Sequence, residues 1–374
     1  MKNLIFVFIL FFLFSCENQT SNKLSSSVVN KTEPMQWLNL KGNSSFLKNK
    51  KIVLVSGDEE YRSEEALPML GKILATHHGF DCKVLFAQDP AHLGIVDPNY
   101  QKNIVGLEAL EDTDLMILFT RFRDLPNKQM QYFENYLQKG KPIIAIRTAT
   151  HAFNIKDSLS NYQHWGNYYK GEKTDWHGGF GKKILGANWH THHGHHKQQS
   201  TRGQFAEGAK ENPILKNIEV EKIWGATDVY GHPLPMPDGT EILIIGQTID
   251  RTEPFNETDL FFGMRPTDNK LATINTQSKQ NPNDPMMPIV WTKAYQIKNG
   301  KQGMSFTSTI GASSDLVNEE LRKLFVNATY HLLDLPVPEN MEVSFVGKYE
   351  PTQFSFHKDE FFDKKNLKIS DFVD

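Results

Sequence analysis

The chain has 374 residues, a net charge of −3 and two cysteines. It has no long block of like charges, which argues against nucleic acid as a partner, and two cysteines cannot build a disulfide framework. A packed hydrophobic core must therefore carry its stability, and the length, although large for one domain, suits an α/β fold.

The first residues predict export. Lys2 supplies a positive start, an apolar run extends from Leu4 to Phe14, and Ser15-Cys16 ends it. This run is too short to remain as a transmembrane anchor. Its ending resembles a bacterial lipobox, which implies cleavage before Cys16 and lipid attachment to that cysteine; the alternative is an ordinary secretory signal with an incidental cysteine.

These features predict a lipoprotein signal peptide over residues 1–15 and a flexible tether over residues 16–48. The tether is rich in Ser, Asn, Lys and Thr and has too few large apolar residues to order itself. One domain is expected over residues 49–335, followed by a C-terminal extension over residues 336–374 that packs over the surface or ends as a partly ordered tail. The mature protein would be anchored to a cell-envelope membrane, on its periplasmic or surface face.

Strand and helix patterns alternate through the first half of the domain. Lys51–Gly57 is an almost continuously apolar run, typical of a strand buried on both faces of a parallel sheet. A helical pattern over Glu64–His78 follows it. Further strands are predicted at 81–86, 114–120, 141–146, 241–247, 288–294 and 305–310, with helices at 127–138 and from about 315 to 333. The alternation predicts an α/β fold with a doubly wound, mostly parallel sheet and an elaborated, less regular second half.

Charged turns follow three of the predicted parallel strands. Their candidate site residues are, in chain order, Glu60 and Arg62, Arg121 and Arg123, and Arg147 and His151. Ligands of open α/β sheets bind beyond the carboxyl ends of the strands. We therefore expect these side chains to line one polar cleft.

Arg147 stands where hydrolases with a nucleophile elbow place a serine or cysteine. A guanidinium group cannot attack a carbonyl carbon and stays protonated, which argues against serine or cysteine acyl transfer. The cation would instead bind a carboxylate, an enolate or a sugar oxygen. The alternative is a structural ion pair with Glu59 or Glu60.

Five of the seven residues from His190 to His196 are histidine. Imidazole titrates near neutrality and is the commonest metal ligand, so the cluster predicts a metal site or a group that moves protons. In the absence of thiolates, two or three histidines with a carboxylate would leave one coordination position open, as in catalytic zinc sites. The expected ligands are His193, His195 and His196, and the alternative is exposed histidines bonded to their own loop.

Several motifs resemble the ThuA-like, or trehalose-utilisation, family. They are Ser56–Glu65, Phe119–Asp124, Ile146–His151, His192–His196, Trp224–Gly231 and Asn283–Met287. The resemblance spans roughly residues 51–335 and implies a class I glutamine amidotransferase-like, flavodoxin-like sheet. It also implies a role in the catabolism of disaccharides and their 3-keto derivatives, often beside a sugar oxidoreductase. Amidotransferases of this fold carry a catalytic cysteine where Arg147 stands, so glutaminase activity is not expected.

The first functional hypothesis is a lipid-anchored enzyme, a lyase, hydrolase or isomerase, that acts on 3-keto glycosides or disaccharides. A 3-keto group acidifies the neighbouring C–H bond, so a general base can form an enediolate that a cation or a metal stabilises. The expected catalytic residues are His193, His196, Arg147, Glu60 and Asp228. The expected substrate-binding residues are Arg62, Arg121, Arg123, His151, Trp176, Trp224 and Tyr230.

The second hypothesis is a non-catalytic, carbohydrate-binding lipoprotein in which aromatic side chains stack on sugar rings. Its stacking residues would be Trp165, Tyr168, Trp176 and Trp224. Such a protein would hand its sugar to a transporter. Under both hypotheses the partners are a small carbohydrate and the membrane through lipid on Cys16, and the family resemblance adds a sugar oxidoreductase of the same pathway. The expected cofactor is one divalent, zinc-like metal, and no nucleotide cofactor is expected.

Overall fold

The computed structural model describes residues 33–43 and 50–373. The predicted signal peptide, Cys16 and most of the predicted tether lie outside these residues. Residues Pro34–Asp374 form one unit by their contacts. Among the described residues, no helix has the length and apolar character needed to cross a bilayer.

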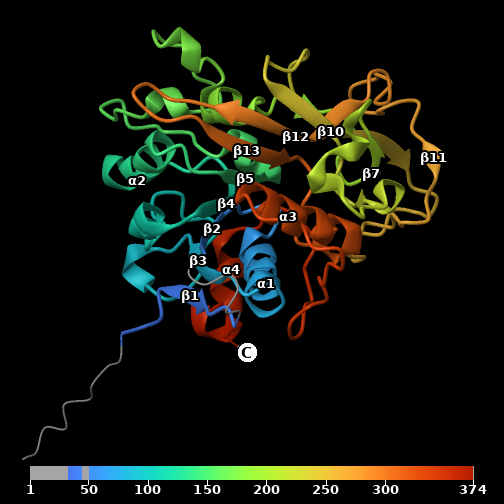
Figure 1. The fold of residues 1–374 in the computed structure, drawn as a ribbon. Coiled ribbons are helices and arrows are strands. Elements are labelled where there is room, and N and C mark those ends of the chain that lie inside the picture. Colours follow the sequence, from blue (N-terminus) through green and yellow to red (C-terminus); the bar gives the residue numbers. More distant parts are fainter. Residues whose placement is uncertain (1–32, 44–49, 374) are drawn as a thin grey trace, which may run out of the picture. The chain divides into compact units, whose positions relative to one another are not determined.

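An eleven-stranded mixed sheet lies at the centre of this unit (Figure 1). Its order is β1-β3-β2-β4-β5-β13-β12-β10-β7-β8, with β11 beside β10. The strands are β1 (Trp37–Leu40), β2 (Lys51–Gly57), β3 (Asp81–Phe86), β4 (Leu115–Thr120), β5 (Ile143–Ile146), β7 (Gln199–Phe205), β8 (Trp224–Gly225), β10 (Thr240–Asp250), β11 (Lys270–Leu271), β12 (Met287–Tyr295) and β13 (Gly303–Ser308). A separate pair joins β6 (Thr191–His192) to β9 (Tyr230–Gly231).

The prediction of an α/β fold is confirmed, but the sheet is mixed rather than mostly parallel. Between the described strands of this sheet, the parallel pairings are those among β3, β2, β4, β5 and β13. Strands β12, β10, β7 and β8 extend the sheet in antiparallel fashion, and β1 adds an antiparallel edge. Antiparallel neighbours need no helical crossover, which is why the second half shows little strand–helix alternation.

The two faces of the sheet carry different cores. Ile52 and Leu54 of β2 belong to one core, whereas Val53 and Val55 belong to the other, because successive side chains of a strand point to opposite faces. Helices α1 (Ser63–Thr76) and α3 (Glu319–Leu332) contribute to the first core, and α2 (Asn127–Gln138) contributes to the second. A short helix, α4 (Asp359–Lys365), lies near the C-terminus.

Strand β2 lies between β3 and β4. The chain leaves β2 to form β3 on one side and then crosses to form β4 on the other side. Such a reversal of strand order opens a crevice at the carboxyl ends of the two diverging strands, where open α/β sheets bind ligands. The fold thus places the turns after β2, β4 and β5 around one crevice.

Two ends of the unit differ from the sequence prediction. Strand β1 pairs with β3 through Trp37↔Leu85 and the following residues, so this part of the predicted tether belongs to the sheet. The C-terminal extension also contributes to the core: Phe354 and Ile369 are fully buried within it. Long-range packing orders both segments, and their local composition gave no indication of it.

Glu64 in the first turn of α1 supplies a test of this packing. Its side chain is buried, Arg62 Nη1 lies 3.4 Å from Oε1, and Oε2 has no hydrogen-bond partner among the described residues. Burial raises the pKa of Glu64 from 4.5 to about 7, against the opposing effect of Arg62. A carboxyl group with a raised pKa in the folded state stabilises the fold below its unfolded pKa, and this contribution is lost as the pH rises through the folded pKa.

We therefore expect the free energy of unfolding of Glu64→Gln, relative to that of the wild type, to increase from pH 4 to pH 8 by up to about 3 kcal/mol. Urea denaturation at both pH values measures the change. Glu360→Gln, on the exposed surface of α4, is the control and should show no such gain. An equal difference between Glu64→Gln and wild type at both pH values would contradict the prediction.

Candidate active site

The turn after β2 is buried and rigid. Asp58 Oδ1 accepts hydrogen bonds from the backbone N–H groups of Glu60 at 2.7 Å and Tyr61 at 2.6 Å. Asp residues favour such turns because their side chains bond to the backbone two or three residues on. Arg62 then adopts a left-handed conformation with φ of 59° and donates to the carbonyl oxygen of Glu59. These bonds fix the positions of Glu59 and Glu60 at the end of β2.

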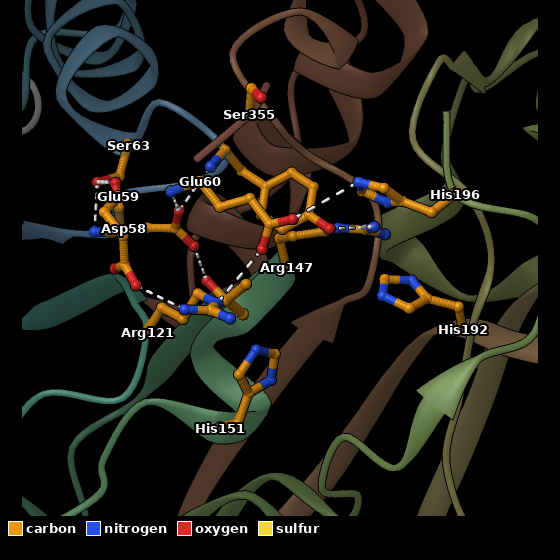
Figure 2. Close-up of polar contacts among 12 residues, drawn as sticks. Asp58, Glu59, Glu60, Ser63, Arg121, Arg147, His151, His192, His196 and Ser355 are labelled. Atoms are coloured by element: carbon orange, nitrogen blue, oxygen red, sulfur yellow. Dashed lines mark hydrogen bonds and ion pairs between the residues drawn. The ribbon is translucent and has the colours of Figure 1, made fainter. Parts of the chain in front are cut away.

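Arg121, in the turn after β4, lies between two carboxylates (Figure 2). Its Nη1 contacts Glu59 Oε1 at 2.5 Å, and its Nε lies 3.3 Å from Glu60 Oε2. Arg123 Nη2 contacts the other oxygen of Glu59 at 2.5 Å. Burial lowers the pKa of Arg121, but the charges of Glu59 and Glu60 outweigh burial and raise it. Arg121 therefore remains a cation and holds Glu60 in place.

Arg147 occupies a tight turn directly after β5, with φ of 46°. Its Nη1 donates to the backbone oxygens of Asp228 at 2.9 Å and Thr309 at 2.6 Å. Its Nη2 lies 3.3 Å from Asp228 Oδ1 and donates to the Tyr61 hydroxyl at 3.2 Å. The elbow geometry agrees with the sequence prediction, but the predicted alternative partners are wrong, because the arginine pairs with Asp228 and not with Glu59 or Glu60.

Asp228 also holds two histidines. Its Oδ2 lies 2.9 Å from His192 Nδ1, and its Oδ1 lies 2.9 Å from His196 Nδ1. Burial would raise the pKa of Asp228, but the hydrogen bonds and charges of the two histidines hold it far below its usual value. Burial likewise acts to lower the pKa of His192, and the bond and charge of Asp228 outweigh it and raise that pKa. Asp228 is thus a buried anion that orients both imidazole rings.

A cavity of about 100 Å³ opens where these groups meet (Figure 2). Its polar lining includes Glu60, Arg121, Arg147, His151 and His192. Its aromatic lining consists of Tyr61, Phe122, Trp189, Tyr230 and Phe356.

Two lining groups have shifted acidities. Burial raises the pKa of Glu60 despite the neighbouring Arg121. Burial also holds the pKa of His151 well below its usual value, with Arg121 adding to the effect. The cavity therefore combines a carboxyl group of increased basicity with a histidine that stays neutral.

The structure brings many predicted site residues to this cavity from distant parts of the chain. Those that line it are Glu60, Arg121, Arg147, His151 and Tyr230. His196 contacts this group, because its Nε2 lies 3.6 Å from Glu60 Oε1, and Asp228 contacts it through Arg147 and His192. The turns after β2, β4 and β5 and the histidine-rich segment thus converge on one site.

Other predicted residues lie away from the cavity lining. Arg62 and Arg123 are buried beneath the turns, and Trp176 stacks on Trp165 with ring centroids 5.4 Å apart. Trp224 is buried and donates from Nε1 to Ser200 Oγ at 3.1 Å. This placement does not support the prediction that these four residues contact substrate. Tryptophan is a core residue more often than a stacking surface, and here packing decided the outcome.

His193 and His195 also point elsewhere. His193 Nε2 lies 3.2 Å from the carbonyl oxygen of Pro285, and His195 Nδ1 bonds to Thr276 Oγ1 at 2.5 Å. Side chains alternate in extended chain, so only one of His192 and His193 could face the site. The pairing of His192 with Tyr230 between β6 and β9 turns His192 toward the site. The sequence prediction named His193 instead and was wrong.

Trp189 and Phe356 are further lining residues that the sequence reasoning missed. Trp189 directly precedes the histidine cluster, and this proximity was the available signal. Phe356 belongs to the C-terminal extension and carried no local signal, because only the tertiary fold brings it to Glu60.

His192, His196 and Asp228 could hold a metal ion. One ligand atom from each lies within 4.8 Å of the others. Two imidazoles and a carboxylate form a donor set that suits zinc with an open coordination position. This group corrects the predicted set of His193, His195 and His196, of which only His196 belongs to it.

Comparison with known proteins gives matches of low identity. No protein-family model and no curated protein matches the chain. Similar solved structures include a "Putative thua-like protein" from Bacteroides uniformis, with 15% identity and a TM-score of 0.41, covering 75% of this chain and 90% of that one. Another of the same description, from Parabacteroides merdae, has 13% identity and a TM-score of 0.42, covering 83% and 98%. A cytoplasmic protein from Salmonella typhimurium has 10% identity and a TM-score of 0.36, covering 76% and 98%.

Two of these descriptions carry the family name that the sequence motifs predicted. The identities are too low for any activity to be transferred to this chain.

The Arg147–Asp228 pair can be tested by its effect on stability. Its side chains are 2% and 0% exposed, and breaking a buried pair leaves an uncompensated charge. We expect Arg147→Met to destabilise the fold by about 3–5 kcal/mol, measured by urea denaturation.

The control is Arg265→Met. Arg265 pairs with Asp259 at 2.8 Å, but the two side chains are 39% and 22% exposed, so its loss should cost less than about 1 kcal/mol. A similar loss of stability in the two variants would show that the buried charge of Asp228 does not need Arg147 as its partner.

Proposed function

We propose that this protein is an enzyme that acts on 3-keto glycosides or disaccharides by removing the proton next to the keto group. The observation that carries the proposal is a single cavity where Glu60 lies against Arg121 and His196 at the carboxyl ends of the parallel strands. The sugar class follows from the motifs that resemble ThuA-like proteins. The same motifs support a flavodoxin-like arrangement of the parallel strands, whose order β3-β2-β4-β5-β13 fits it.

The charge pattern of the cavity favours a neutral, polar substrate. Arg121 is paired with Glu59 and Glu60, and Arg147 is paired with Asp228. A phosphate or carboxylate ligand is normally bound by cations that are free to form charge-assisted hydrogen bonds, and here both lining arginines already have carboxylate partners. Sugar hydroxyl and keto groups need only hydrogen-bond donors and acceptors, which these side chains offer.

The size of the cavity favours one sugar ring. Pockets for larger ligands span about 300–1,000 Å³, whereas this cavity measures about 100 Å³. Tyr61, Trp189 and Tyr230 supply apolar ring faces beside the polar groups. An oxidised ring could therefore place its carbonyl and hydroxyl groups against Glu60 and Arg121 while its C–H face packs on aromatic carbon.

Glu60 is the group placed to move the proton. Its carboxylate takes the proton from C2, between the keto carbon C3 and the anomeric carbon C1, and the electron pair gives an enediolate. The guanidinium of Arg121 stabilises the negative charge on the oxygen. When the C1–O bond then breaks, the electron pair forms a C1=C2 double bond, and Glu60 returns the proton to the departing oxygen. The products are an unsaturated keto sugar and the free alcohol or second sugar.

Turnover is tested by incubating the protein with 3-keto-trehalose or a 3-keto-glucoside and following the products by NMR. Glu60→Gln should lower kcat by at least about 100-fold, because an amide cannot accept the proton. His195→Gln, whose ring bonds to Thr276 away from the cavity, is the matched control and should retain activity. Line broadening of the sugar without consumption would instead identify a carbohydrate-binding protein, and activity retained in Glu60→Gln would remove Glu60 from the mechanism.

A divalent metal forms a further part of the proposal. His192, His196 and Asp228 would hold it, and a bound ion would polarise a keto oxygen as a Lewis acid. The support is the donor set itself, two imidazoles and one buried carboxylate.

Metal analysis of protein purified without a His tag tests this part. After incubation with Zn²⁺ and removal of free ion, we expect one equivalent in the wild type and in His193→Gln, and a loss of stoichiometric binding in His192→Gln and His196→Gln. His193 is the matched control because it neighbours His192 but bonds to Pro285. Substoichiometric metal in the wild type would contradict the prediction.

We also propose that the enzyme works at the cell envelope, anchored by lipid on Cys16, with a sugar oxidoreductase of the same pathway supplying the keto group. The lipobox-like ending of the apolar run supports the anchor, and the family resemblance supports the pathway. Both stay predictions from the sequence.

A further inference from the structure

Three aromatic side chains gather at the mouth of the cavity. Phe122 and Phe356 line it, and the ring of Tyr168 stacks on Phe122 with centroids 5.8 Å apart and an interplanar angle of 26°. Tyr168 is 58% exposed and Phe356 is 55% exposed. Single exposed aromatic residues are ordinary on protein surfaces, but here Tyr168 extends an aromatic face that begins at the cavity-lining Phe122.

Arg121 joins the two sides of this entrance. The central carbon of its guanidinium lies 4.8 Å from the ring centroid of Phe122 and 4.7 Å from that of Phe356. Cation–π contacts of this kind fix the relative positions of the groups involved. The same arginine contacts Glu60, so Arg121 connects the two rings to the candidate catalytic carboxylate.

The backbone holds Phe122 in an unfavourable conformation. Its φ is 46°, which lies in a region that bulky residues rarely adopt. Its N–H donates to the carbonyl oxygen of His151 at 2.9 Å, and the next N–H, of Arg123, donates to that of Ala152 at 2.7 Å. Strain of this kind persists where the surrounding structure imposes it, and here it directs the ring to the cavity mouth.

Phe356 is held from the other side by the C-terminal extension. The Ser355 N–H donates to the carbonyl oxygen of Glu60 at 2.9 Å, and the Ser355 carbonyl accepts from Arg62 Nη2 at 2.6 Å. The preceding residue, Phe354, is fully buried and stacks on Tyr61 with centroids 5.4 Å apart. Phe356 is therefore an exposed ring on a firmly bonded segment, directly beside the turn that carries Glu60.

We propose that Phe122, Tyr168 and Phe356 form an outer subsite that binds the second ring of the substrate, either a second sugar or an aryl group, by stacking. The inference rests on the proposed function, which places the oxidised ring in the inner cavity. That cavity suits one ring, so the ring attached through the glycosidic oxygen must lie at the mouth. Aromatic faces there offer the apolar contact that the C–H face of a sugar or a phenyl ring needs.

Three probes distinguish the inner cavity from the outer subsite: methyl 3-keto-glucoside, 3-keto-trehalose and unoxidised phenyl glucoside. We expect Phe356→Ala to raise the KM, or the Kd measured by NMR titration, of 3-keto-trehalose by about 5-fold, since a stacked ring pair contributes about 1 kcal/mol. Tyr168→Ala removes the ring of the three that is not among the cavity-lining residues, so it should also raise the value for 3-keto-trehalose but change that for the one-ring methyl compound less than twofold. Saturation-transfer signals from the phenyl protons of phenyl glucoside should appear with the wild type and disappear with Phe356→Ala.

Phe255→Ala is the matched control. Phe255 is 43% exposed and lies 5.2 Å from the guanidinium carbon of Arg251, so it is also an exposed ring on an arginine, but it is not among the residues that line this cavity. It should leave all three measurements unchanged.

The outcomes separate the two proposals. Equal weakening of the one-ring and two-ring probes by Tyr168→Ala, or no weakening of either probe, would overturn the subsite. An absence of phenyl saturation transfer in the wild type would also overturn it. Phenyl signals that depend on Phe356 without turnover of either keto sugar would leave the subsite standing and remove the proposed chemistry.

Discussion

One buried carboxylate, that of Asp228, organises the site. It is fully enclosed, and it contacts Arg147 from the turn after β5 and His192 and His196 from the histidine-rich segment. An isolated charge at this depth would be very costly, so the folded state requires all of these partners in place together. This requirement joins the parallel half of the sheet to the irregular second half at the carboxyl ends of the strands.

A second group of charged side chains lies in the turns after β2 and β4. Asp58 shapes the turn after β2, Glu59 pairs with Arg121 and Arg123, and Arg121 reaches Glu60. Since the glutamates and arginines of this group pair with one another, the site gains many oriented polar groups without a large net charge. Preorganised groups of this kind stabilise charge that develops on a substrate without reorganising themselves, which suits proton removal from a neutral sugar.

The C-terminal extension is part of the structure that supports the site. Its backbone bonds to Glu60 and Arg62, and its Phe354 packs on Tyr61 and His196. The turn that carries the candidate base therefore depends on residues about 300 positions further along the chain. The segment has few long apolar runs, so its composition predicts a peripheral position. Scattered aromatic residues such as Phe354 and Phe362 are nevertheless enough to pack it against the core.

The sequence by itself determined the α/β class, the parallel strands around β2, β4 and β5, and the charged turns at their carboxyl ends, because continuous apolar runs and polar strand ends are local patterns. Tertiary structure decided which polar residues face the cavity. His192 rather than His193 faces it, Trp224 is a core residue, and Arg147 pairs with Asp228. Each of these outcomes depends on contacts between segments far apart in the chain, and no local pattern of apolar and polar residues encodes them.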